Sequence, residues 1–202
     1  MKHLKFFGDS INTRHIDDAV RILREGGVVI YPTDTIYALG CDALNNKAIE
    51  RLCRLKGINP DKHLLSIVCA SLSQAAEYAK IDNRAFRLLK EYLPGPFTFI
   101  LPAANYLPKV FKGRKSVGIR IPDNEIARNL AETLGNPVLS TSVSIDIDED
   151  TVSPDYLALT YQHDADLLID AGEGRSELST IVDCLDSSSP EIVRQGAGTI
   201  EL

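Results

Sequence analysis

The stretch that most constrains the fold is residues 26–40, GGVVIYPTDTIYALG. Its two glycines end an amphipathic segment, residues 14–25, whose apolar side chains recur at helical spacing. Val28–Tyr31 then lacks any polar alternation, which is typical of a strand buried on both faces. Pro32 ends this strand, and two threonines and an aspartate follow it. A helix, a buried strand and a polar strand end in this order predict an α/β unit, in which ligands usually bind at strand ends.

The rest of the chain repeats this interleaving of helical and extended patterns. Further helices are predicted over residues 46–56, 73–78, 83–92 and 124–134, and further strands over 64–69, 97–101, 116–121, 138–142, 167–170, 180–184 and 191–194. The last two strands have no helix between them, which indicates that part of the sheet is antiparallel. We therefore predict an α/β fold with an open, twisted sheet of mixed parallel and antiparallel strands and flanking helices. Segment 145–166 is acidic without a clear period, and we expect it to be a mobile excursion.

Composition narrows the class of protein further. A chain of 202 residues suits one domain, residues 1–202, and its apolar and charged fractions of 44% and 25% are ordinary for a soluble protein. No apolar run is long enough to span a membrane, and the N-terminus lacks a signal peptide, so we expect a cytoplasmic location. The net charge of −6 argues against nucleic-acid binding by the whole surface, but a local basic cleft stays open.

Cysteine usage gives no indication of a metal site. The four cysteines form no CxxC pair and have no histidine at ligand spacing, so we expect reduced, mostly buried thiols and no protein-bound metal; they are Cys41, Cys53, Cys69 and Cys184.

Several polar residues stand where a strand or helix ends, and each has a structural alternative. Lys56 closes a predicted helix, where its ammonium could reach an anion or only favour the helix dipole. Arg120 lies within an otherwise apolar strand, so its charge must point into a polar cleft or form an internal ion pair. In the PTDT segment, Asp34 and Thr35 could line a site or hydrogen-bond their own turn. Ser140 and other hydroxyls recur at later strand ends.

Taken together, these segments resemble one family. The motifs are GGVVIYPTDTIYALGCDA, LCRLKG, LPGPFTFIL, VGIRIP, PVLSTS, STIVD and VRQGAG. From about residue 14 to residue 196, the chain resembles the YrdC/YciO family, the fold of threonylcarbamoyl-adenylate synthases, and it is more similar to the YciO branch. The resemblance implies an open twisted α/β sheet with a concave, positively charged cleft. Because the chain ends at Leu202, we expect it to lack the extra C-terminal domain of longer family members.

The resemblance also implies an activity, its substrates and the residues that bind them. Enzymes of the family condense L-threonine, bicarbonate and ATP into threonylcarbamoyl-AMP and pyrophosphate. The threonylcarbamoyl-AMP is then used to modify adenosine 37 in tRNA. Mg²⁺ would arrive on the ATP phosphates. By position, threonine would contact Thr35, Arg120, Ser140 and Ser179. The nucleotide would contact Lys56, Ser142 and Arg194.

Two positions depart from the family pattern of the synthases. Where synthases have Lys-x-Arg, this chain has Ile58 in place of the arginine, and where they have Ser-x-Asn, it has Ser144 in place of the asparagine. Arg54, one helical turn before the altered position, could substitute for the missing cation. Losing a phosphate contact at a catalytic site costs on the order of 10²–10³ in rate, so a weakened synthase is one reading.

Two alternatives follow from these departures. The first is a protein that kept the cleft but binds RNA or a nucleotide without synthesis, with tRNA or double-stranded RNA held through its phosphates. The second is an enzyme that acts on acyl- or carbamoyl-adenylates, because a weaker grip on pyrophosphate suits the forward condensation poorly.

Overall fold

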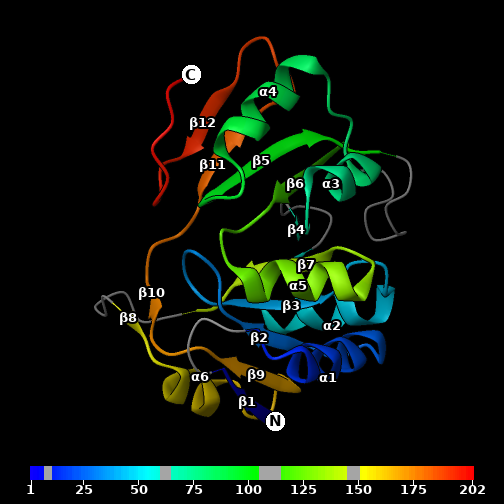
Figure 1. Cartoon of the computed structure of the whole chain (residues 1–202), viewed down its shortest axis with the longest axis vertical. Helices are drawn as coiled ribbons and strands as arrows, with labels where there is room; N and C mark the ends of the chain where they lie inside the picture. Colours follow the sequence, from blue (N-terminus) through cyan, green and yellow to red (C-terminus); the bar gives the residue numbers. More distant parts are fainter. Residues whose placement is uncertain (7–10, 60–64, 105–114, 145–150) are drawn as a thin grey trace.

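The computed structural model describes residues 1–6, 11–59, 65–104, 115–144 and 151–202. Its centre is a ten-stranded sheet in the order β1-β9-β2-β3-β7-β4-β6-β5-β11-β12, which descends from β12 to β1 in Figure 1. Its strands are β1 (Lys2–Lys5), β2 (Val29–Tyr31), β3 (Ala38–Asp42), β4 (Ser66–Val68), β5 (Phe97–Pro102), β6 (Ser116–Arg120), β7 (Val138–Ser142), β9 (Leu167–Asp170), β11 (Thr180–Asp183) and β12 (Glu191–Arg194). A separate short pair joins β8 (Thr151–Val152) to β10 (Gly174–Arg175).

Six helices flank the sheet in the described part of the chain. They are α1 (Thr13–Arg24), α2 (Asn46–Leu55), α3 (Leu72–Tyr78), α4 (Asn83–Tyr92), α5 (Glu125–Leu134) and α6 (Pro154–Thr160). Their ends carry the caps that the sequence indicates: Asn124 accepts a hydrogen bond from the backbone of Ala127 at the start of α5, and Gly135 ends that helix at φ +77°.

The sheet is mixed, as predicted. Parallel pairs join β1 to β9, β2 to β9, β4 to β6 and β5 to β11, whereas the other neighbours in the ten-stranded sheet run antiparallel. The pair β11–β12 is antiparallel, which confirms the reading of these consecutive strands. The predicted α/β class is therefore confirmed.

Each face of the sheet has its own core. Helices α2, α3, α4 and α6 pack on one face, over side chains such as Leu139 and Ile67. Helices α1 and α5 pack on the other face, over side chains such as Val138 and Val68. Because side chains alternate along a strand, Ser140 and Ser66 share the face of Val138 and Val68.

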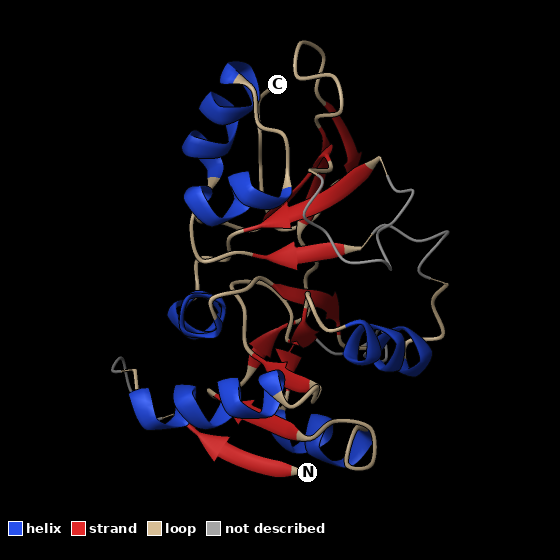
Figure 2. Cartoon of the chain, turned by 90° about the vertical axis from the view of Figure 1, so that its right-hand side faces the viewer, coloured by secondary structure: helices blue, strands red, loops and turns tan. Residues whose placement is uncertain are grey.

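This second face is left partly open, and the opening positions the site. Around the upper strands β5, β6, β11 and β12, the described helices lie on one side only, as Figure 2 shows. The small and polar residues that continue the α1/α5 face along β7, β4 and β6 are therefore not covered by any of the described helices.

One prediction about the chain is wrong. Of the segment 145–166 that was expected to be an excursion, residues 151–166 contain β8 and α6 and bury Leu157 and Tyr161 in the core, while residues 145–150 lie outside the described residues. A helix this short offers too few turns for an apolar period to be recognised. The sequence reading also omitted β1, β3 and β10, and predicted strand residue 64 lies outside the described residues.

Two further expectations concern burial and membranes. All four cysteines are buried, as predicted. None of the described helices combines the length and apolar character that crossing a membrane requires.

Candidate functional site

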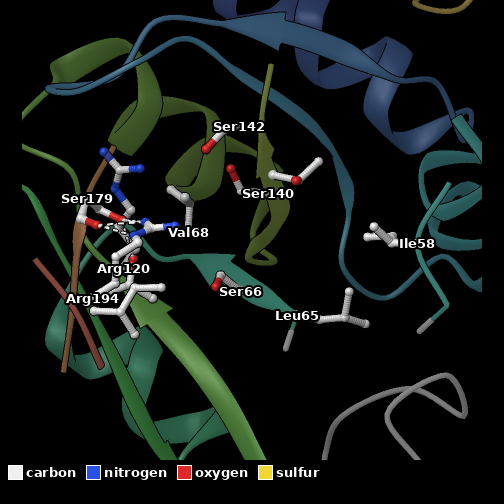
Figure 3. Close-up of a pocket in the computed structure, with 12 residues that line it drawn as sticks. Ile58, Leu65, Ser66, Val68, Arg120, Ser140, Ser142, Ser179 and Arg194 are labelled. Carbon is white, nitrogen blue, oxygen red and sulfur yellow. Dashed lines mark hydrogen bonds between the residues drawn. The ribbon is translucent and has the colours of Figure 1, made fainter. Parts of the chain in front are cut away.

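A pocket of about 190 Å³ opens on the uncovered face of the sheet. It is shown in Figure 3. Its lining comes from β4, β5, β6, β7, β11, β12 and the segments beside them: Ile58, Leu65, Ser66, Val68, Thr98, Arg120, Ser140, Thr141, Ser142, Ser179, Ile181 and Arg194. Residues far apart in the sequence therefore converge in one hollow.

Strand register explains why the floor of this pocket is polar and empty. Ser66 pairs directly with Gly118 on one side and with Ser140 on the other. A Cβ atom at position 118 would lie 2.5 Å from Ser66 Oγ and 3.2 Å from Thr98 Cγ2. Glycine thus leaves open a space that any other side chain would fill.

Arg120 at the end of β6 is held by the PTDT segment. Its Nη2 atom donates to Asp34 Oδ1 at 2.7 Å, to Thr35 Oγ1 at 2.5 Å and to Thr33 Oγ1 at 3.1 Å. The side chains of Arg120 and Asp34 are only 9% and 10% exposed. Asp34 in turn accepts from the backbone N–H of Asp123 through Oδ2 at 3.1 Å, so the pair is fixed at both ends.

Arg194 of β12 provides a second guanidinium. Its Nη2 and Nε atoms donate to the carbonyl oxygen of Ser179 at 2.7 and 3.2 Å. The Ser179 hydroxyl lies 3.0 Å from Thr98 Oγ1. Figure 3 shows Arg120, Arg194 and Ser179 together at one side of the pocket.

The charges at this side of the pocket are unbalanced in favour of a bound anion. Burial lowers the pKa of Arg194, and the positive charge of Arg120 lowers it further. Among the described residues, Asp34 is the only carboxylate in contact with either arginine. The Nε atom of Arg120 is buried and has no hydrogen-bond partner in the described structure. An unpaired buried donor is costly, and the two guanidinium groups beside a single described carboxylate leave positive charge at the pocket that an anion would offset.

The opposite side of the pocket is apolar. Ile58 and Leu65 lie there, away from the two arginines, as Figure 3 shows. Beside them Lys56, at the end of α2, donates through Nζ to Ser144 Oγ at 2.6 Å. Burial lowers the pKa of Lys56.

Most of the residues selected from the sequence meet here. Arg120, Ser140, Ser142, Ser179 and Arg194 all line the pocket. The Ser140 hydroxyl accepts a hydrogen bond from the buried Tyr31 phenol at 2.7 Å. Both open readings of Arg120 hold at once, since it forms an internal ion pair and also lines the cleft.

The other selected residues lie differently. Thr35 is 1% exposed and contacts Arg120 beneath the pocket, so its contact with threonine stays a prediction. Lys56 reaches Ser144, two residues after Ser142. Arg54 is exposed and lines a separate hollow with Arg51, Leu55, His163 and Asp164.

The sequence predicts one contact of the site incompletely and leaves out one residue that shapes it. Asp34 is predicted to line a site or to hydrogen-bond its own turn, but its partner Arg120, 86 positions away, leaves no local signal. Tyr161 accepts a hydrogen bond from the backbone of Ser144 at 2.8 Å, and its position in an unpatterned segment gave no signal.

The sequence is similar to that of proteins in a known family. A family model named for Sua5, YciO and YrdC, described as "Telomere recombination", matches residues 21–196. YciO of Escherichia coli (strain K12) is 40% identical over 196 residues, which cover 96% of this chain and 94% of that protein. The threonylcarbamoyl-AMP synthase of Pyrococcus abyssi is 34% identical over 185 residues, which cover 91% of this chain and 54% of the synthase.

Solved structures agree with these similarities. The crystal structure of E. coli YciO superposes with a TM-score of 0.89 at 37% identity, covering 98% of both chains. The crystal structure of P. abyssi Sua5 complexed with L-threonine superposes with a TM-score of 0.84 at 33% identity, covering 96% of this chain and 57% of that one.

Proposed function

This chain belongs to the Sua5/YciO/YrdC family, and on that premise we propose that it is an enzyme of the threonylcarbamoyl-AMP synthase type. It would condense L-threonine, bicarbonate and ATP into threonylcarbamoyl-AMP and pyrophosphate. The observation that carries the proposal is the pair of arginines, Arg120 buried and Arg194 half-buried, in a pocket lined by serine hydroxyls. The P. abyssi relative that binds L-threonine supports the choice of amino acid.

The roles of the residues follow from charge and position. Arg120 pairs with the threonine carboxylate, and Ser140 and Ser179 hydrogen-bond the amino acid. Lys56 and Arg194 contact the nucleotide phosphates. A pocket of about 190 Å³ is smaller than the ~300–1,000 Å³ typical of ligand sites, so it encloses the amino acid and the reacting phosphate while the rest of ATP extends beyond it.

The chemistry needs cations more than it needs a base. The threonine amine joins bicarbonate with loss of water, and an oxygen of the resulting carbamate attacks the α-phosphorus as the bond to pyrophosphate breaks. Cations and hydroxyl donors offset the repulsion between the anions that must meet. Mg²⁺ enters with the ATP phosphates, and the described residues hold no group of three His, Cys, Asp or Glu side chains that would cage a metal.

The experiment is to incubate the purified protein with ATP, labelled bicarbonate and threonine, beside a known synthase. We expect threonine-dependent pyrophosphate release and a labelled adenylate. Arg120→Met should lower the rate about 10²-fold or more. Arg21→Met, an exposed arginine on α1, should leave it unchanged. No threonine-dependent release while the known synthase is active would refute the proposal.

A second candidate is favoured by the apolar wall. Ile58 lines the pocket where the resemblance implies an arginine, so the protein would bind an adenylate, or act on one, without efficient synthesis. Binding of ATP and threonine in a thermal-shift assay, without pyrophosphate release, would support this candidate. Breakdown of prepared threonylcarbamoyl-AMP would identify the enzymatic form of it.

The described geometry favours a small anion over double-stranded RNA. Arg120 is too buried for the phosphates of a rigid duplex to reach it. If RNA binds nevertheless, we expect Lys56→Glu combined with Arg120→Glu to leave its affinity unchanged. A fall in affinity would instead place tRNA or double-stranded RNA in this pocket.

A further inference from the structure

A chain of hydrogen bonds connects Lys56 to a tyrosine in the core. The Nζ atom of Lys56 donates to Ser144 Oγ at 2.6 Å, and the backbone N–H of Ser144 donates to Tyr161 Oη at 2.8 Å. Tyr161 follows α6, in the segment where the sequence gave no sign of structure. These contacts join the end of α2, the residues after β7 and the end of α6.

Tyr161 is held rigidly within this series of hydrogen bonds. It is 5% exposed and packs in the core below α6. Its backbone N–H donates to Leu157 O at 3.0 Å, and its carbonyl accepts from Asp164 and Ala165. Its phenolic oxygen therefore cannot shift without disturbing the helix end.

The residues after β7 are held at two successive positions. Val143 is buried, and its N–H donates to the carbonyl of Tyr37 at 3.1 Å. The next N–H, that of Ser144, is the one that Tyr161 accepts. Without Tyr161, the backbone of Ser144 would lose its hydrogen bond, and only the flexible Lys56 side chain would hold this residue among the contacts described here.

Ser144 in turn restrains the flexible side chain of Lys56 through a hydrogen bond. A lysine side chain has four rotatable bonds and loses up to about 2 kcal/mol of conformational entropy when it is fixed. The Ser144 hydroxyl accepts from Lys56 and keeps its own O–H, which has no acceptor among the described residues. Ser142 and Ile58, each two residues from this contact, both line the pocket.

We propose that Tyr161 is a positioning residue of the anion site: through Ser144 it holds the Lys56 ammonium at the edge of the pocket, ready for a phosphate group. The proposal rests on the proposed function, since it assigns Lys56 to the nucleotide phosphates. Ser144, which stands where the synthases have asparagine, thus connects Tyr161 to Lys56 and helps to position the cation.

The test measures binding of inorganic pyrophosphate by calorimetry in a set of matched variants. Tyr161→Phe removes the acceptor and keeps the ring, and we expect it to weaken binding about 3- to 10-fold. Tyr156→Phe is the control, because Tyr156 lies on α6, the helix that ends just before Tyr161, and its hydroxyl has no hydrogen bond with a described residue. It should leave the affinity unchanged.

A double-mutant cycle separates positioning from general loosening of the fold. In a Lys56→Met background, Tyr161→Phe should cause no further loss, because the side chain that it positions is gone. Ser144→Ala should weaken binding as Tyr161→Phe does, and Ser144→Thr should restore it. Ser144 is exposed, so these two variants keep the test valid even if Tyr161→Phe unfolds.

The outcomes distinguish the two proposals. Wild-type affinity in Tyr161→Phe and Ser144→Ala, additive losses in the Lys56→Met background, or no pyrophosphate binding by the wild type would each overturn the role of Tyr161. Failure of the proposed synthase activity is seen separately, as absence of threonine-dependent pyrophosphate release in the wild type.

Discussion

Neutralising Asp34 is the perturbation that tests the electrostatics of the site most directly. At the observed separation of 2.7 Å between Asp34 Oδ1 and Arg120 Nη2, the attraction is about 6 kcal/mol at an effective dielectric constant of about 20. Desolvation of the two buried ions offsets part of this gain. Asp34→Asn keeps the shape and one acceptor, and Thr33 and Thr35 still accept from Arg120.

We therefore expect Asp34→Asn to lower the free energy of unfolding by about 2–4 kcal/mol. With a urea m-value of about 2 kcal/mol/M, the unfolding midpoint should fall by about 1–2 M at an unchanged slope. Asp123→Asn is the matched control, because the neighbouring Asp123 carboxylate pairs with Arg128 but is 72% exposed. Its loss should stay below about 1 kcal/mol.

The same variant makes a second, independent prediction. With Asp34 neutral, Arg120 and Arg194 face the pocket without a carboxylate in contact among the described residues, so pyrophosphate should bind more tightly. Added pyrophosphate should then raise the stability of Asp34→Asn by more than that of the wild type. A stability loss no larger than that of Asp123→Asn, or equal stabilisation of both proteins by pyrophosphate, would refute this account of the pocket.

Three more changes have expected outcomes. Gly118→Ala places a methyl group 2.5 Å from Ser66 Oγ, so we expect weaker ligand binding by calorimetry and a loss of about 1–3 kcal/mol in urea unfolding. Tyr37→Phe loses the hydrogen bonds of the phenol to the backbone of residues 171 and 172 and should lower the free energy of unfolding by about 1–2 kcal/mol. Burial raises the Tyr37 pKa to about 12, above the value of about 10 expected in the unfolded chain. The wild type should therefore lose stability as pH rises from about 10 toward 12, and the variant should lose less. Ile58→Arg adds a cation to the apolar wall and should tighten pyrophosphate binding about 10-fold, an effect that high salt should reduce.

Local patterns in the sequence predict most helices and strands of this fold. α4 and β7 have the predicted bounds, since a capping aspartate and a clear apolar pattern define them. β3 was missed because Ala38–Asp42 contains no β-branched residue and follows the PTDT turn. Its Gly40 lies where a Cβ would meet the Tyr31 ring and Val138, a requirement of close packing that only the paired strands reveal.

The site was predictable in its residue types and not in its contacts. Arg120 attracts notice because a charge inside an apolar strand must have a partner. That partner, Asp34, is 86 positions away, and nothing in the local pattern links them. The same holds for Lys56 and Ser144, which are separated by 88 positions. Such pairs are set by strand order, which depends on the whole chain.

Strand order also explains how one sheet face can serve both folding and binding. Along β7, Val138 packs under the helices of its face, while Ser140 and Ser142 continue the same face beyond them into the pocket. The alternation that buries Leu139 on the far side necessarily points both serines into the hollow. A one-residue slip of β7 would bury the serines against the opposite core and remove hydroxyls from the pocket at once. The register that stabilises the core is therefore the same register that assembles the anion site, and mutations that weaken one should weaken the other.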